Sequence, residues 1–138
     1  MKSLNMNHLF FSFLVLLISP AILNAAPVIQ KKWETAAEFK LPESVIYDET
    51  NNVLYVSSMQ DDPFKKDGNG FISKVGLDGK IIELNCVTGL NAPKGMAILD
   101  GNLYVADVDQ LVEIDIEARK ITNRYDAVGA GVLNDVIA

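Results

Sequence analysis

A polar loop between residues 61 and 70 holds the densest cluster of side chains that could bind a metal ion. Hard cations such as calcium prefer carboxylate and amide oxygens. The loop offers such oxygens from Asp61, Asp62, Asp67 and Asn69. The stretch 67–70 resembles part of a calcium-binding loop, but it lacks the regular ligand spacing and the distal bidentate glutamate that such a loop requires. We therefore predict a long connection between two strands here.

A nucleophilic thiol is the second kind of chemistry to consider, because the chain has a single cysteine, Cys86. A catalytic thiol needs a neighbouring base, and the single histidine, His8, lies in an N-terminal segment with the features of an export signal. We therefore predict that Cys86 packs as a small apolar residue near a strand end. One cysteine cannot form an internal disulfide, so an exported chain of this kind must fold through core burial or a bound metal.

Two further groups of residues have simpler predicted roles. Asp107 and Asp109 follow a β-rich run, and we predict that they form a turn, because aspartate side chains bond to nearby backbone groups. The small residues at 129–131 predict a linker rather than a phosphate-binding loop. Neither a preceding parallel strand nor a following helix is evident around them.

The first 25 residues have the features of a cleavable secretory signal. Lys2 is their only Lys or Arg, an apolar run extends from Leu9 to Leu17, and Ala25 and Ala26 supply the small residues of a cleavage site. We predict cleavage after Ala25 and a periplasmic or secreted location. A membrane anchor would need about 20 apolar residues, so we expect no stable anchor after cleavage. The run is interrupted by Ser19, Pro20 and Asn24.

The charge of the chain argues against a nucleic-acid partner. It has 12 Lys and Arg against 18 Asp and Glu, a net charge of −6. The basic residues are scattered singly or in pairs such as Lys31-Lys32 and Lys65-Lys66. Because a nucleic-acid-binding surface needs clustered cations that neutralise phosphates, we predict no nucleic-acid partner.

An internal repeat organises the rest of the chain. The segment 42–47 is followed by the apolar run 53–57. The same pattern returns at 93–98, which is followed by 102–107, and the opening of a third copy lies at 133–138. Each copy therefore corresponds to one structural unit.

Each full copy contains four short β-rich runs separated by turn residues. Asp78-Gly79 and Asp100-Gly101 are typical of tight turns, because glycine tolerates a positive φ. The predicted strands are 44–47, 53–57, 71–77 and 80–84 in the first copy and 95–99, 102–106, 111–116 and 120–125 in the second. No segment after residue 27 shows a sustained helical period, so we expect few helices.

Four such strands per unit are the pattern of one propeller blade. We therefore predict an all-β chain with a lead-in at 26–40 and an incomplete β-propeller at 41–138. Within that domain, the first blade covers about 41–88, the second about 90–127, and the start of a third 132–138. Two blades cannot close a ring and would leave strand edges and apolar faces exposed. We expect the sequence to be a fragment of a longer chain or, as the alternative, a truncated product that needs a partner.

The repeat resembles the six-bladed propellers of the family that contains senescence marker protein, gluconolactonase and luciferin-regenerating enzyme, together with related NHL-type repeat proteins. The residues that carry the resemblance are 41–45, 52–57, 92–96, 103–107 and 133–136. The resemblance as a whole covers nearly the entire chain after the signal segment. The resemblance is weaker evidence for a function than for a fold, because the same sequence pattern occurs in propellers with many activities.

The resemblance implies a site in the central channel of the propeller. Members of the family hold a divalent cation there, most often calcium and in some members zinc, and Glu43 matches one of its carboxylate ligands. Asn134 matches a position that contacts substrate in the lactonases. The sugar-lactone enzymes place an arginine two residues before this asparagine, whereas this chain has Val132. The remaining ligands and the base of the family would lie beyond Ala138.

Three function hypotheses follow from the residues and the resemblance. The first is an exported, metal-dependent hydrolase of lactones or similar esters, with Glu43 as a metal ligand and Asn134 orienting the substrate. The second is a non-catalytic exported propeller that binds a small ligand or a protein partner on its face. A third reading is an unstable, inactive truncated product. The sequence leaves the substrate, the cation and the oligomeric state open.

Overall fold

The computed structural model describes residues 27–138. The predicted signal segment, residues 1–25, lies outside the described residues. Residues 31–138 form one compact unit that contains every strand described below. Within 27–138 no segment is helical, and hence none is a helix that could cross a bilayer.

The first four strands form an antiparallel sheet in the order β1-β2-β3-β4. The strands are β1 (Pro42–Asp48), β2 (Val53–Ser58), β3 (Gly70–Gly76) and β4 (Ile81–Leu90). Each strand pairs with the next one along the chain, so this first sheet is a meander.

The second sheet repeats this arrangement in the order β5-β6-β7-β8. Its strands are β5 (Pro93–Leu99), β6 (Asn102–Asp107), β7 (Gln110–Asp115) and β8 (Lys120–Asp126). The prediction of an all-β chain with two groups of four strands is confirmed.

One strand extends well past its predicted end, whereas the bounds of the others differ from the predictions by no more than two residues. We predicted that the fourth run ends at Leu84, whereas β4 continues to Leu90. Its pairing with β3 includes register shifts, so the longer strand follows β3 through irregularities instead of ending at them. Cys86 accordingly lies within β4 and not near its end, although it is buried as predicted.

Left-handed backbone conformations close the tight turns between strands. In the β1–β2 turn Asn52 has a φ of 55°. The Asp48 carboxylate supports this turn by accepting hydrogen bonds from the backbone amides of Thr50 and Asn51, each at 3.0 Å. In the β5–β6 turn Asp100 and Gly101 both have a positive φ. Such turns suit the twist of antiparallel hairpins.

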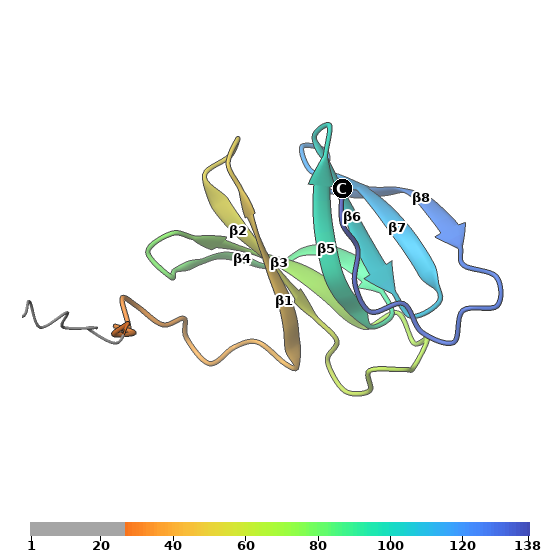
Figure 1. The fold of residues 1–138 in the computed structure, drawn as a ribbon, viewed down its shortest axis with the longest axis horizontal. Coiled ribbons are helices and arrows are strands. Elements are labelled where there is room, and N and C mark those ends of the chain that lie inside the picture. Colours follow the sequence, from red (N-terminus) through yellow and green to blue (C-terminus); the bar gives the residue numbers. More distant parts are fainter. Residues whose placement is uncertain (1–26) are drawn as a thin grey trace, which may run out of the picture. The chain divides into compact units, whose positions relative to one another are not determined.

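The two sheets meet along their first strands, because β1 packs against β5 (Figure 1). The core lies between them and contains side chains from both sheets. Its buried members are Val53, Tyr55, Ile72, Cys86, Val87, Leu90, Met96, Leu103, Val105, Val112 and Ile114. Both sheets therefore share one core, which positions the beginnings of β1 and β5.

The segment 132–138, which we predicted to open a third blade, forms no strand. It nevertheless lies on the second sheet. The amide of Leu133 donates to the carbonyl of Val108 at 2.6 Å, and the amide of Gly95 donates to the carbonyl of Asn134 at 3.0 Å. The segment is thus held close to the beginning of β5.

Candidate functional site at the first-strand bulges

β1 and β5 each contain a β-bulge at the same place. The register of β1 against β2 shifts within 42–45, and the register of β5 against β6 shifts within 93–96. Glu43 lies in the first bulge and Lys94 in the second. Bulges redirect side chains and occur often beside functional sites. We use the name first-strand bulges for these two segments.

Glu43 is exposed in the first of these bulges. It borders a shallow hollow of about 160 Å³ together with Ser44, Val45 and their neighbours. The amide of Ser44 donates to Ser57 Oγ at 3.1 Å, which fastens the bulge to β2. Within residues 27–138 the Glu43 carboxylate has no ion-pair partner. It is therefore open to a ligand from solvent.

Lys94 occupies the equivalent position in β5 and is buried, with 4% of its surface exposed. Its ammonium group donates to the carbonyl of Pro63 at 2.8 Å and lies 3.1 Å from Met59 Sδ. It also lies 5.8 Å from the centre of the Phe64 ring, within the range of a cation–π interaction. Lys94 thus holds the β2–β3 connection and is not presented to solvent.

Asn134 is exposed, and only its backbone carbonyl takes part in a described contact, the bond from Gly95. The following residue, Asp135, lies directly on Gly95. A Cβ atom added at Gly95 would come within 2.1 Å of Asp135 Oδ1 and 2.7 Å of Asp135 Cα. Glycine is required here because of this close approach.

No hydrogen bond or common hollow joins Glu43 to Asn134 among the described residues. They lie at related places because β1 packs against β5 and the two strands run the same way (Figure 1). Glu43 begins the first of these strands, and Asn134 bonds to the beginning of the second. The structure therefore places both predicted residues at the same end of the paired strands without forming a closed site.

Contrary to our prediction, the Asp107 side chain does not support a turn through nearby backbone groups. It is completely buried at the end of β6. Its carboxylate accepts hydrogen bonds from the amides of Asn91 at 2.9 Å and Ala92 at 2.7 Å, and lies 3.6 Å from the Arg124 guanidinium. Burial raises the pKa of Asp107 above its usual value. Asp107 therefore ties the connection between the two sheets to the second one.

Asp109 lies in the β6–β7 turn as predicted, although its carboxylate forms an ion pair with Lys66 in the β2–β3 connection and not a bond to nearby backbone. The acidic loop itself is the long strand connection that we predicted. In it Asp67 accepts from the amide of Asn69 and pairs with Lys65 at 3.1 Å. These contacts of Asp67 are internal to the loop.

A divalent cation at the first-strand bulges would need more ligands than the described residues bring together. Calcium takes about six to eight oxygen ligands, and Glu43 supplies one carboxylate. Within residues 27–138 no three His, Cys, Asp or Glu side chains converge on a common point. The residues described here do not by themselves fit a metal site, so no chemical step is derived through a cation.

Lys94 is the residue at these bulges that sequence reasoning missed. It occupies the position of Glu43 in the repeat, since Pro93-Lys94 aligns with Pro42-Glu43. That alignment could have drawn attention to it. Its burial, however, depends on contacts with Pro63 and its neighbours, which are about thirty positions away along the chain.

Comparison of the chain with protein-family models, curated proteins and solved structures finds no match.

Proposed function

We propose that the two sheets are consecutive blades of a β-propeller. One observation carries this proposal: two four-stranded meanders pack with their first strands side by side and with their bulges at the same place. In a propeller the first strand of every blade lies nearest the axis, and each blade covers its neighbour. The contact of segment 132–138 with the beginning of β5 supports the same arrangement.

We propose further that the first-strand bulges form part of a binding site for a small polar ligand, of which a lactone is the first candidate. Glu43 is exposed and has no ion-pair partner within 27–138, so its carboxylate is free to bind a ligand hydroxyl or to contribute to a cation site. The Asn134 amide offers both a donor and an acceptor. The resemblance to lactone hydrolases motivates the choice of ligand, and the predicted export signal motivates a periplasmic or secreted location.

Hydrolysis of a panel of lactones, with and without added calcium or zinc, tests this function. We expect Glu43→Gln to lower the rate of hydrolysis, or the affinity for a cation, by at least about tenfold. The reason is that the glutamine amide lacks the negative charge with which the Glu43 carboxylate would attract a cation or strengthen a hydrogen bond from the ligand. The matched control is Glu49→Gln, an exposed glutamate in the turn beyond the other end of β1.

The outcomes separate the hypotheses. Cation-dependent hydrolysis that Glu43→Gln reduces supports the hydrolase. Saturable binding without hydrolysis supports the alternative, a non-catalytic binding propeller. If the chain unfolds cooperatively but shows no binding and no hydrolysis, the first-strand bulges are not a binding site.

A further inference from the structure

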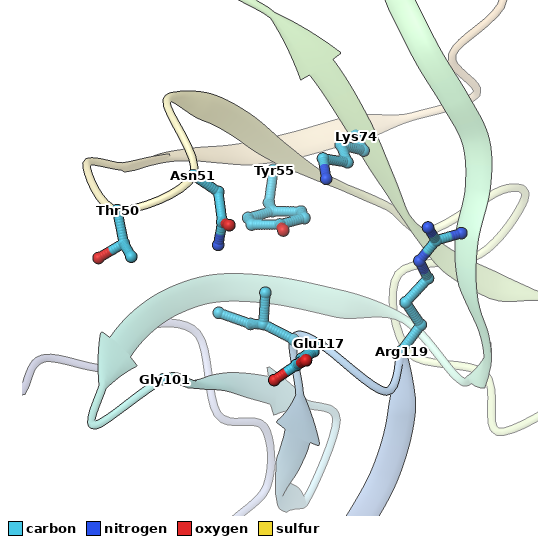
Figure 2. A pocket seen from close by; sticks show the side chains of 8 residues that line it. Thr50, Asn51, Tyr55, Lys74, Gly101, Glu117 and Arg119 are labelled. Carbon is cyan, nitrogen blue, oxygen red and sulfur yellow. The ribbon is translucent and has the colours of Figure 1, made fainter.

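A second pocket lies between the two sheets, at the far end of β1 from Glu43. Its volume is about 450 Å³, within the range of about 300–1,000 Å³ that is usual for small-molecule sites. The walls include the β1–β2 turn at Thr50 and Asn51 and side chains of β2 and β3. On the opposite side are the β5–β6 turn and the β7–β8 turn (Figure 2). No residue of this pocket belongs to the first-strand bulges.

Tyr55 lines this pocket from β2 and is only 4% exposed. The hydroxyls of the other three tyrosines, Tyr47, Tyr104 and Tyr125, donate to side chains of the protein. Within residues 27–138 the Tyr55 hydroxyl has no such partner, and Figure 2 shows the ring directed from the first sheet toward the opposite wall. Burial, together with the charge of Asp48, raises the pKa of Tyr55 to about 12. The hydroxyl therefore remains a hydrogen-bond donor at neutral pH.

Lys74 lies next to Tyr55 on the adjacent strand β3, since the two residues are cross-strand partners. Its next cross-strand partner is Glu83 on β4. Glu83 pairs with Arg119 of the second sheet at 2.7 Å, which leaves Lys74 without an ion-pair partner in the part of the chain that the structure describes. The ammonium group of Lys74 is thus a charge that the described protein residues do not balance by direct contact.

The carboxylates near the pocket limit the charge of its ligand. Glu117 lines the wall formed by the second sheet and is exposed. Asp48 is buried, but the backbone and side-chain amides of Asn51 already donate to it at 3.0 and 2.7 Å. Glu117 would repel a ligand with several negative charges. A ligand with a single carboxylate can place it near Lys74 and Tyr55, on the wall opposite Glu117.

We propose that this pocket binds a small molecule through one carboxylate group, held by the Lys74 ammonium and the Tyr55 hydroxyl. Arg119 contributes as well, because its guanidinium has five N–H donors and only one described bond, to Glu83. This binding is independent of the function proposed for the first-strand bulges, which lie at the other end of β1.

Titration of the chain with sodium acetate, followed by two-dimensional NMR, tests the proposal. Sodium chloride at equal ionic strength is the reference, because it screens charges without offering a carboxylate. We expect shifts of the amides of residues 50–55, 74 and 117–119. We expect Lys74→Gln to weaken binding by about tenfold or more, and Tyr55→Phe, which keeps the ring in the core, to weaken it several-fold.

Two further variants make the test specific. Glu117→Gln should strengthen acetate binding, because it removes the opposing charge. Lys80→Gln is the matched control, since Lys80 is an exposed lysine paired with Asp78 outside the pocket, and it should leave binding unchanged. Three outcomes would each overturn the proposal. The first is that acetate shifts the amide signals no more than chloride does, and the second is that the shifts are confined to the surroundings of other lysines. The third is that Lys74→Gln and Lys80→Gln have equal effects on binding. Inorganic phosphate binding more tightly than acetate would overturn the preference for a single charge.

Discussion

Glu43 and Lys94 occupy the same position in two equivalent β-bulges, yet the glutamate is exposed and the lysine is buried. The difference arises from the β2–β3 connection, which supplies the carbonyl of Pro63 to the Lys94 ammonium at 2.8 Å. One bulge is therefore available to a ligand. The other anchors a loop beside it.

Replacing Lys94 by methionine tests this anchoring role. Lys94→Met keeps most of the buried side-chain volume but leaves the carbonyl of Pro63 without its donor. An apolar side chain also avoids the cost of burying a charge, so we expect a net loss of only about 1 kcal/mol in the free energy of unfolding. The sharper readout is hydrogen exchange, which should quicken in residues 59–69. The control is Lys65→Met, an exposed lysine of the same loop. Equal exchange in the two variants would contradict the anchoring role.

Asp107 should affect stability in a pH-dependent way. Its pKa is raised in the folded state by burial, so its contribution to stability is fully present below the unfolded-state pKa of about 4. It is lost as the pH rises through the raised folded-state pKa. We expect Asp107→Asn to remove this part of the slope, because the amide oxygen can still accept from Ala92 without titrating. Urea unfolding of both proteins between acid and neutral pH measures the difference.

Asp107→Leu is the companion variant. It leaves the backbone amides of Asn91 and Ala92, of which that of Ala92 is buried, without their acceptor, so we expect it to lower the free energy of unfolding by about 2 kcal/mol or more. A leucine variant as stable as the asparagine variant would show that the hydrogen bonds to Asp107 do not hold the connection between the sheets.

The strands could be predicted from the sequence because their signals are local. Alternation of apolar residues marks the strands, and Asp78-Gly79 and Asp100-Gly101 mark tight turns. β4 was predicted too short: it continues past Leu84 to Leu90 and includes Gly89, which has a φ of 82°. The long-range pairing with β3 and the burial of Leu90 extend the strand past Leu84.

The sites could be predicted only in part, because their residues come together through long-range packing and not through local sequence patterns. Glu43 stood out only through the resemblance to the propeller family, and its role as a metal ligand stays a prediction. The pocket beside Tyr55 combines side chains from both sheets, among them Lys74 and Arg119. No local pattern reports such a combination, since it depends on how the sheets pack. The burial of Asp107 likewise depends on the connection that it holds.

Glu113 organises a polar network on the face of the second sheet. Its carboxylate accepts hydrogen bonds from Asn102, Tyr104, Asn123 and Tyr125, the last at 2.6 Å. The bond from Tyr125 is the main cause that lowers the pKa of Glu113, and it raises the pKa of Tyr125. Glu113 therefore stabilises the fold above the ordinary glutamate pKa, and this contribution is lost as the pH falls through the lowered value.

We expect Glu113→Gln to abolish this acid-dependent contribution and to move the Tyr125 titration to lower pH. Ultraviolet titration of the tyrosines measures the second effect directly. Glu38→Gln, at an exposed glutamate of the lead-in, should change neither. A Tyr125 pKa that is the same with glutamine at position 113 would show that the bond does not persist in solution.

Gly95 should be the residue on which the attachment of the C-terminal segment depends. A methyl group at this position would come within 2.1 Å of Asp135 Oδ1 and 2.7 Å of its Cα, a clash with both side chain and backbone. We expect Gly95→Ala to displace residues 133–135 from β5, to speed exchange of the Leu133 amide about tenfold, and to cost about 1–3 kcal/mol of unfolding free energy. Gly131→Ala is the matched control, because an added Cβ there meets no atom within 4 Å. Equal exchange of Leu133 in the two variants would mean that the segment does not rest on the beginning of β5.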